Sequence, residues 1–371
     1  MAEPIRVLQV FAKMNRGGAE TMIMDLYHHI DRTKVQFDFI VHTAEKCDFD
    51  DEIEQLGGNI YSMPKYNGKN HFIYKKAWDD FFKEHSEYNI IHGHLRSTAA
   101  IYLKIAKRYG MITIAHSHST SSGNGYKAFV KNLLQHQIKF TSDYMLACSY
   151  DAGKWLFGGK NIELNKCKNL KNAIEISKFI FNKDVRMKVR KDLNLDGKYV
   201  VGHVGRFYPP KNHEFVIDVF NLIKKEKDNA VLILIGDGPD RKIIEDKVQK
   251  FGLGNSVIFL GVRSDVNELI QAMDVFLFPS KYEGLGIVLI EAQASGLKCI
   301  VSDLIPEEAF VTDLVESISL KKSTDVWKTA ILKYSDGYPR RNTYEEIKAK
   351  GYDIIDTANW LENFYLSIKN N

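Results

Sequence analysis

The segment FPSKYEGLGIVLIEAQASGLKCIVS (278–302) joins two apolar runs through a glycine-rich loop and a helical stretch. Val275–Phe278 and Lys298–Ser302 have the composition of buried strands, and the run from about Ile287 to Ala294 has helical period. Short apolar runs that alternate with helical segments are typical of βα units joined into a parallel sheet. The segment therefore predicts one unit of a doubly wound α/β domain.

The same alternation extends along the whole chain, so we expect two such domains. The other predicted strands are Ile5–Phe11, Phe37–His42, Asn59–Met63, Ile90–His92, Ile112–His116, Tyr144–Cys148, Tyr199–Val204, Ala230–Ile235 and Val257–Leu260. No convincing strand lies between residues 172 and 196, which places the domain boundary there, with domains at 1–180 and 181–352. The last stretch has helical period and no strand to pair with, so it packs either on its own domain or across the other. Two facing parallel sheets form a cleft, and ligands bind at the carboxyl ends of the strands.

The composition excludes several classes of protein. With 371 residues, 44% hydrophobic and 26% charged, the chain has enough apolar side chains for two cores and is not disordered. Its four cysteines lie far apart with no CxxC pair, which argues against a disulfide framework or a structural zinc site. We expect no signal peptide in MAEPIRVLQVF and no membrane span, hence a cytoplasmic protein that is soluble or peripheral to a membrane.

The charge is unevenly distributed. The net charge of +4 is too small to indicate nucleic acid binding, but residues 88–178 contain 13 basic and 4 acidic residues. This basic segment mixes cations with amphipathic aromatic residues, namely Arg96, Lys104, Lys107, Arg108, Lys127, Lys131, Lys139 and Lys154 with Tyr102, Tyr109, Tyr126, Phe129 and Trp155. Such a surface suits anionic lipid headgroups or a phosphorylated acceptor. The alternative is a set of ordinary solvated helix faces.

Two glycine-containing loops follow predicted strands. In AKMNRGGAE (12–20), Gly17 and Gly18 precede a helix, where uncrowded backbone N–H groups can approach an anion or simply form a tight turn. The absence of G-x-G-x-x-G argues against a dinucleotide site. In VGHVGRFYPPK (201–211), Gly205 opens a loop stiffened by two prolines and carrying Arg206 and Lys211. Two cations on one rigid loop can clamp a diphosphate, although either alone could be an ordinary surface cation.

The EGLGIVLIE stretch (283–291) places two glutamates around a predicted helix start. If the helix begins near Gly286, its N-terminal amides can accept negative charge, and Glu291 lies about one turn inside it. A carboxylate there can accept hydrogen bonds from both hydroxyls of a ribose, while Glu283 can contact a neutral polar group. Together these features describe a site for a nucleotide diphosphate-sugar. The alternative for Glu291 is a solvated helix glutamate.

These motifs resemble those of the family-4 retaining glycosyltransferases of the GT-B fold. The resemblance rests on EGLGIVLIE, GRFYPPK, GGAE and the SxxEGLGxxxxEAxAxGxxxxxSD frame (280–303), and it covers nearly the whole chain. ACSYDAGKWLFG (147–158) and AHSHS (115–119) further resemble the branch that builds bacterial capsular polysaccharide and exopolysaccharide. The resemblance implies two facing Rossmann-like domains, the first binding the acceptor and the second the donor. It also implies that a C-terminal helix at about 353–371 returns to the first domain.

The resemblance also assigns roles to individual residues. It implies that Arg206 and Lys211 neutralise the donor diphosphate, that Glu291 holds the ribose and that Glu283 lies beside the transferred sugar. The remaining donor contacts that it implies are Gly17, Gly18, Gly205, Val262, Arg263, Gly284, Leu285, Gly286 and Ile287. The expected catalytic residues are Arg206, Lys211 and Glu283, with His118 from the first domain.

Histidines end two neighbouring strands of the first half. The resemblance implies that one histidine reaches the sugar. His116 and His118 both qualify, and we favour His118 because the loop should begin there. His92 and His94 end the neighbouring strand and, with His116, are candidates for the acceptor side. A His-x-His pair also suggests a metal, but we expect no metal and no other cofactor, because cations and a helix start already offset the leaving diphosphate.

The expected activity is transfer of a sugar, with retained configuration, from a nucleotide diphosphate-sugar to a glycan or a polyprenyl-diphosphate-linked saccharide. We expect UDP because it is the commonest donor nucleotide in the family, and contact with the inner membrane face because of the basic segment. The alternatives are a sugar-nucleotide epimerase, a hydrolysing relative and a non-catalytic partner of a transferase. The last would be expected to lose Arg206, Lys211, Glu283 or Glu291, and this chain retains all four.

Overall fold

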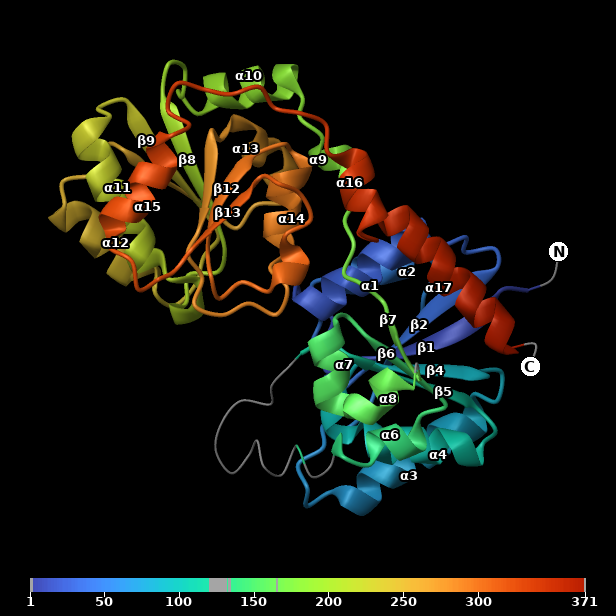
Figure 1. Ribbon diagram of the computed structural model, residues 1–371. Helices are drawn as coiled ribbons and strands as arrows, with labels where there is room; N and C mark the ends of the chain where they lie inside the picture. Colours follow the sequence, from blue (N-terminus) through green and yellow to red (C-terminus); the bar gives the residue numbers. More distant parts are fainter. Residues whose placement is uncertain (1–2, 120–131, 133–134, 165, 370–371) are drawn as a thin grey trace. The chain divides into compact units, whose positions relative to one another are not determined.

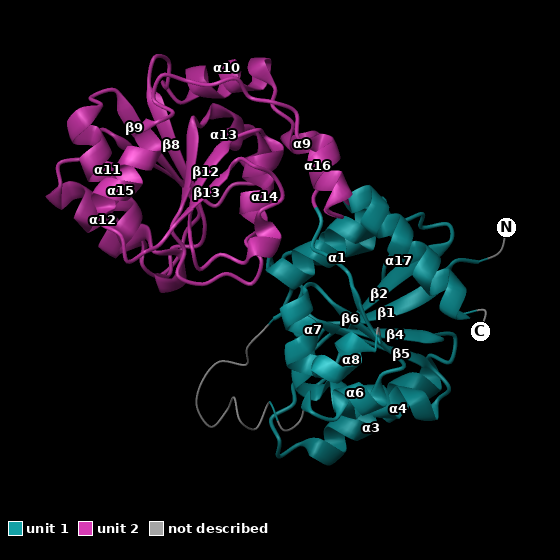
Figure 2. Cartoon of the chain, viewed as in Figure 1, with its two compact units in different colours: residues 1–173, 354–371 teal, residues 174–353 magenta. Residues whose placement is uncertain are grey.

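The computed structural model describes residues 3–119, 132, 135–164 and 166–369 (Figure 1). The chain divides into two compact units (Figure 2). Unit 1 comprises residues 1–173 and 354–371, and unit 2 comprises residues 174–353.

Unit 1 is built on a seven-stranded parallel sheet with the strand order β3-β2-β1-β4-β5-β6-β7. Its strands are β1 (Ile5–Val10), β2 (Val35–Val41), β3 (Ile60–Ser62), β4 (Ile90–Gly93), β5 (Ile112–Ser117), β6 (Tyr144–Ala147) and β7 (Cys167–Asn169). Its α-helices are α1 (Gly18–His29), α2 (Asp50–Gln55), α3 (His71–Glu84), α4 (Ala99–Arg108), α6 (Ile138–Thr141), α7 (Tyr150–Phe157), α8 (Gly159–Glu163) and α17 (Ile354–Lys369), with a 3-10 turn at Arg96–Thr98.

Helices cover both faces of this sheet, because successive strand residues point to opposite sides. Val7 and Phe37 lie in one core cluster with residues of α1 and α17. Leu8 lies in the other cluster, with the completely buried Trp78 and Tyr102 of α3 and α4. The sheet is therefore buried on both faces, and its accessible edge is where the strands end.

Unit 2 repeats this architecture with a six-stranded parallel sheet of order β10-β9-β8-β11-β12-β13. Its strands are β8 (Tyr199–Val204), β9 (Ala230–Ile235), β10 (Val257–Gly261), β11 (Val275–Phe278), β12 (Lys298–Ser302) and β13 (Val315–Ile318). Its α-helices are α9 (Ile176–Phe179), α10 (Lys183–Asp192), α11 (His213–Glu226), α12 (Arg241–Lys250), α13 (Val266–Ala272), α14 (Ile287–Ala294), α15 (Thr324–Leu332) and α16 (Tyr344–Ala349), with 3-10 turns at Pro209–Lys211 and Glu307–Ala309.

The structure contains all the predicted strands and two that the sequence analysis missed. Both missed strands, β7 and β13, lie at a sheet edge, and neither is a continuous apolar run, since they read CKN and VESI. Edge strands are partly solvated, so they lack the apolar pattern that identifies a central strand.

The second unit begins at Ile174, earlier than the predicted residue 181. The physical reason is that α9 packs against α13, α14 and α16, which buries Ile176 in the core of unit 2. At the other end of the chain, α17 belongs to unit 1, where Tyr365 packs edge-on against Phe37 at 5.9 Å between ring centroids. Among the described residues, the structure has no helix with the length and apolar character that a membrane crossing requires.

Candidate functional site

The loops at the carboxyl ends of β8 and β9 pack against each other through their backbones. The Phe207 N–H donates to the Asp237 carbonyl at 3.0 Å, and the Gly205 N–H donates to the Ile235 carbonyl at 2.9 Å. Gly236 has φ +127°, and a Cβ there would lie 2.2 Å from the Gly205 carbonyl oxygen. Glycine is therefore required at this position, and it holds the loop that carries Arg206 and Lys211 in place.

Lys211 forms an ion pair with Glu283 inside unit 2. Its Nζ lies 2.7 Å from Oε1 and 2.9 Å from Oε2, and the two side chains are only 20% and 8% exposed. The ammonium also lies 5.2 Å from the ring centroid of Phe278, the last residue of β11. The structure thus brings together two of the predicted catalytic residues, which are 72 positions apart in the sequence.

Arg206 differs from Lys211 in its surroundings. Its side chain is exposed, and it has no hydrogen-bond or ion-pair partner in the part of the chain that the structure describes. Arg263, in contrast, is held by Asp265 through two contacts, Nε–Oδ1 at 2.7 Å and Nη2–Oδ2 at 2.5 Å. The neighbouring Val262 is 75% exposed. Arg206 is therefore the cation of this set that is available to an anion.

The helix α14 begins at Ile287, as the sequence predicts, with Gly286 as its N-cap. Gly286 has φ +82° and ψ +53°, a left-handed conformation that favours glycine, and a Cβ there would also crowd the Phe278 ring at 3.3 Å. No side chain of the described residues caps this helix start, which leaves its first N–H groups available to a ligand. Leu285 is buried, Gly284 is exposed, and Glu291 is half-buried one turn inside the helix.

Gly17 and Gly18 lie at the start of α1 in unit 1. Gly17 is the N-cap in extended conformation and makes no side-chain cap, and a Cβ on Gly18 would meet nothing within 4 Å. The carboxylate of Glu20 lies in the first turn, where burial raises its pKa. Oε2 of Glu20 lies 2.5 Å from the position that a Cβ on Gly17 would take, so this carboxylate already lies at the start of α1 and only Gly18 has open space beside it.

The predicted histidines gather at the ends of β4 and β5. His94 Nδ1 lies 2.7 Å from His118 Nε2, and the rings of His116 and His118 are 4.0 Å apart. His116 has no exposed surface, whereas His118 follows the last residue of β5 and is half-buried. Burial lowers the pKa of His118 to about 3, so this ring is neutral at physiological pH.

Comparison with known proteins identifies the family. Residues 16–177 match the family model described as Glycosyltransferase Family 4, and residues 185–351 match that of the Glycosyl transferases group 1. EpsF of Bacillus subtilis (strain 168), classed as a glycosyltransferase, is 36% identical over 369 residues, covering 97% of this chain and 96% of EpsF. This chain is a family-4 glycosyltransferase.

Two further relatives resemble this glycosyltransferase over most of its length. The capsular polysaccharide biosynthesis glycosyltransferase CapH of Staphylococcus aureus is 25% identical, covering 98% of this chain and 99% of CapH. The UDP-Gal:α-D-GlcNAc-diphosphoundecaprenol α-1,3-galactosyltransferase of Escherichia coli is 23% identical, covering 76% of each chain.

The GT-B fold of the glycosyltransferase is confirmed by solved structures. HepE of Anabaena, crystallised with UDP and glucose, superimposes with a TM-score of 0.76, covering 98% of this chain and all of HepE, at 17% identity. At that identity the likeness establishes the fold.

Sequence reasoning missed three residues that shape these sites in the glycosyltransferase. Gln9 bonds His94 Nε2 through its amide oxygen at 2.9 Å, and Tyr365 OH lies 2.6 Å from His92 Nδ1. Phe278 lies under Lys211. Gln9 could have been found, because a polar residue in the middle of an apolar strand needs a partner. Tyr365 could not, because only the fold brings α17 to β4.

The basic segment of the glycosyltransferase is only partly a cationic surface. Tyr102 is completely buried, so the prediction that it belongs to this surface was wrong, and Arg96 is half-buried with its guanidinium carbon 4.6 Å from the Trp155 ring centroid. Lys107 pairs with Asp143 at 2.8 Å, and Arg108 pairs with Asp79 at 2.8 Å. The exposed side chains include Lys104, Lys154, Tyr109 and Phe140, while Tyr126, Lys127, Phe129 and Lys131 lie outside the described residues.

Proposed function

We propose that this glycosyltransferase moves a sugar from a UDP-sugar to a lipid-diphosphate-linked saccharide, with retained anomeric configuration, in the synthesis of a capsular or exported polysaccharide. The observation that carries the proposal is the Lys211–Glu283 pair together with the exposed guanidinium of Arg206, in loops that follow the carboxyl ends of parallel strands in unit 2. Ligands of doubly wound sheets bind at this edge.

The donor half of the proposal follows from the charges in unit 2. Arg206 supplies a planar donor fork for a diphosphate, and the uncapped start of α14 supplies backbone N–H groups for a second anionic oxygen. Glu291 accepts hydrogen bonds from the ribose hydroxyls. Glu283 is oriented by Lys211 and contacts the transferred sugar. The choice of UDP is supported by the solved HepE complex with UDP and glucose and by the UDP-galactose in the name of the E. coli relative.

The proposed reaction is a front-side displacement. The bond between the anomeric carbon and the diphosphate oxygen breaks, the acceptor hydroxyl oxygen forms the new glycosidic bond on the same face, and the hydroxyl proton passes to the departing phosphate. Catalysis then consists of stabilising the leaving diphosphate and orienting the acceptor. Arg206 and the α14 amides provide positive charge for this step, while Lys211 is compensated by Glu283 and orients it, so we propose that transfer itself uses no metal.

The acceptor half rests on unit 1 and on the relatives. CapH takes its name from capsular polysaccharide, and the name of the E. coli relative gives a diphosphoundecaprenol acceptor. A groove of about 700 Å³ between α4 and α6 is lined by residues that include Lys104, Lys107 and Phe140. Cations beside an exposed aromatic ring suit an anionic membrane surface, so we propose that this face rests on the cytoplasmic side of the membrane, where lipid-linked acceptors are presented.

The experiment is a thermal-shift panel of the purified protein with UDP, GDP, ADP and UDP bearing a 2′,3′-dideoxyribose. A ligand that binds the native state raises Tm by mass action. We expect UDP to raise Tm most and the dideoxy analogue to raise it less. In Glu291→Ala, UDP and the dideoxy analogue should raise Tm equally. Lys242→Ala is the matched control, because Lys242 is an exposed cation paired with Asp246 on α12.

Absence of a shift with any nucleotide would contradict the donor site. Transfer is then tested by adding a lipid-diphosphate saccharide to the protein with its UDP-sugar. Release of UDP that requires this acceptor supports transfer, whereas release without it indicates a hydrolase, and conversion of the sugar without release indicates an epimerase.

A further inference from the structure

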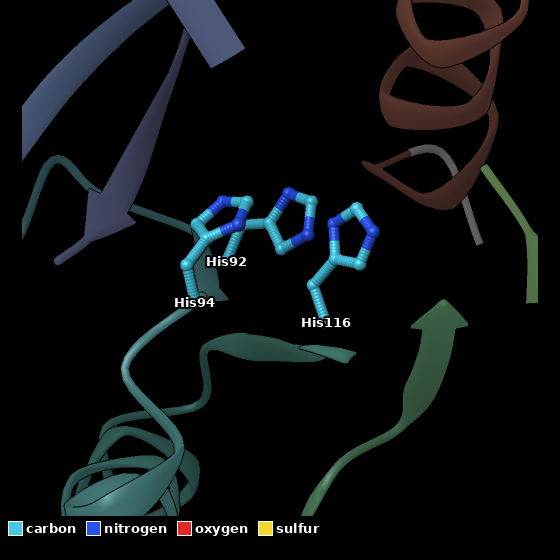
Figure 3. A group of neighbouring side chains, drawn as sticks. All are labelled: His92, His94 and His116. Atoms are coloured by element: carbon cyan, nitrogen blue, oxygen red, sulfur yellow. The ribbon is translucent and has the colours of Figure 1, made fainter. Parts of the chain in front are cut away.

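Three buried histidines of unit 1 form a group with the composition of a metal site. His92, His94 and His116 each offer one ring nitrogen, and these three atoms lie within 4.8 Å of one another. The rings lie next to one another (Figure 3), with centroids 4.3 to 5.3 Å apart. The strand register explains the grouping, because β4 pairs with β5 and residues two apart on a strand share a face.

Several nitrogen atoms of this group are buried without a hydrogen-bond partner among the described residues. They are Nε2 of His92 and both Nδ1 and Nε2 of His116. His92 and His116 have no exposed surface at all. A buried polar atom without a partner costs about 1–3 kcal/mol, so native proteins rarely leave several together unless a ligand satisfies them.

The other ring nitrogens are held in the way that metal-binding histidines are held. His92 Nδ1 lies 2.6 Å from Tyr365 OH, and His94 Nε2 lies 2.9 Å from the amide oxygen of Gln9. Gln9 in turn donates to Tyr365 OH at 3.2 Å. Ligating histidines usually bond their second nitrogen to such an outer partner, which fixes the ring orientation. His92 therefore directs Nε2, and His94 directs Nδ1, away from these partners.

We propose that His92, His94 and His116 bind one divalent transition-metal ion of the zinc type within unit 1. An all-nitrogen donor set without carboxylates favours Zn²⁺, Co²⁺, Ni²⁺ or Cu²⁺ over Mg²⁺, Ca²⁺ or Mn²⁺. Ligand nitrogens about 2.0–2.1 Å from a tetrahedral zinc lie about 3.4 Å apart, so these nitrogens, which lie within 4.8 Å of one another, approach by up to about 1.4 Å on binding. His94 then exchanges its contact with His118 for the metal, and the fourth position remains for water.

The ion would tie β4, β5 and, through Tyr365, α17 together, so it acts first on the stability of unit 1. None of its ligands belongs to the donor site of unit 2, but His94 and His116 are the residues expected on the acceptor side, so the test measures metal uptake and stability and does not use sugar transfer.

The test uses the full chain without an affinity tag, stripped by a chelator and dialysed. Zn²⁺ uptake is measured by calorimetry and elemental analysis, and Co²⁺ replaces Zn²⁺ to report coordination by visible absorption. We expect one equivalent of Zn²⁺, a rise in Tm that a chelator reverses, and the intense Co²⁺ bands of a four-coordinate site.

His116→Phe is the informative variant, because phenylalanine keeps a ring in a site where His116 has no hydrogen bond to lose. It should fold, as far-UV circular dichroism checks, lose the equivalent of Zn²⁺, and melt no lower than the metal-free parent. His29→Gln is the matched control, since His29 is half-exposed on α1, outside the group. Failure of the stripped chain to bind Zn²⁺, or full binding by His116→Phe, would overturn the proposal.

Discussion

Nζ of Lys211 lies 2.7 Å from Oε1 and 2.9 Å from Oε2 of Glu283, which joins the loop after β8 to the loop before α14. Because the pair is largely buried, the charge of Lys211 is already neutralised before any donor arrives. The pair therefore orients Glu283 and fixes the two loops, while Arg206 carries the uncompensated positive charge.

Removing one partner of this pair should destabilise unit 2 more than removing both. Lys211→Met leaves the carboxylate of Glu283 buried without its cation, at a cost of about 3 kcal/mol, whereas Lys211→Met with Glu283→Gln leaves no buried charge. Urea denaturation of the two single variants and the double variant measures the coupling as a double-mutant cycle. If the losses in unfolding free energy of the two single variants simply add up in the double variant, the pair does not hold the loops.

Arg206→Ala should weaken the binding of UDP without weakening the binding of uridine. A hydrogen bond to a charged group contributes about 1.5–3 kcal/mol, which corresponds to about a 10- to 150-fold loss of affinity for the diphosphate. Isothermal titration with both ligands measures the ratio, and Arg206→Lys should restore part of it. Arg263→Ala serves as the comparison, because Asp265 already holds that guanidinium. Equal losses for UDP and uridine would place Arg206 away from the diphosphate.

Sequence periodicity was sufficient to predict the helices and strands that consist of apolar residues throughout. The central strands could be predicted because a strand buried on both faces reads as a continuous apolar run, and α14 could be predicted from its helical period. Edge strand β13, with a glutamate and a serine among its four residues, could not be predicted by the same rule. The domain boundary was placed late because the four residues of α9 belong to unit 2 through the burial of Ile176, which is a tertiary contact.

The sequence motifs indicated candidate site residues one by one but not how these residues pair in the structure. The motifs indicated Lys211 and Glu283 separately, yet the ion pair between them depends on how two strand ends lie side by side. The histidines were likewise visible as two short motifs. That His92 meets Tyr365 depends on the return of the last helix to unit 1, which spacing along the chain does not encode.

Acidification should destabilise unit 2 through His213. Burial, helped by the charge of Lys211, lowers the pKa of His213 to about 4, against about 6.5 in the unfolded chain. Between these values only the unfolded state binds the proton, so the stability of the fold decreases as the pH falls below 6.5, by about 1.4 kcal/mol per pH unit for this group.

The check is the urea midpoint measured between pH 7.5 and pH 5. His213→Phe keeps the stacking on Phe207, whose ring centroid is 4.1 Å away, and should show a smaller decrease than the native chain. His29→Phe is the control, because His29 is half-exposed on α1 of unit 1. Its urea midpoint should decrease with falling pH as much as that of the native chain. The same pH dependence in His213→Phe as in the native chain would rule out this origin.

Phe140→Ser should weaken binding to anionic vesicles. Phe140 is 67% exposed, its ring centroid lies 5.2 Å from Lys139 Nζ, and it borders the groove that also contains Lys104 and Lys107. An aromatic ring inserted at the headgroup level loses its contact on replacement by serine, while Lys104→Ala removes about 1 kcal/mol of attraction to the anionic surface.

Sedimentation with phosphatidylglycerol vesicles measures both losses, and added salt should reduce the lysine contribution but not that of the ring, because only charge is screened. Ile243→Ser changes another exposed apolar side chain, 55% exposed on α12 of unit 2, and should bind as the native chain does. Binding to neutral phosphatidylcholine vesicles as strong as to anionic ones would contradict the assignment of this face.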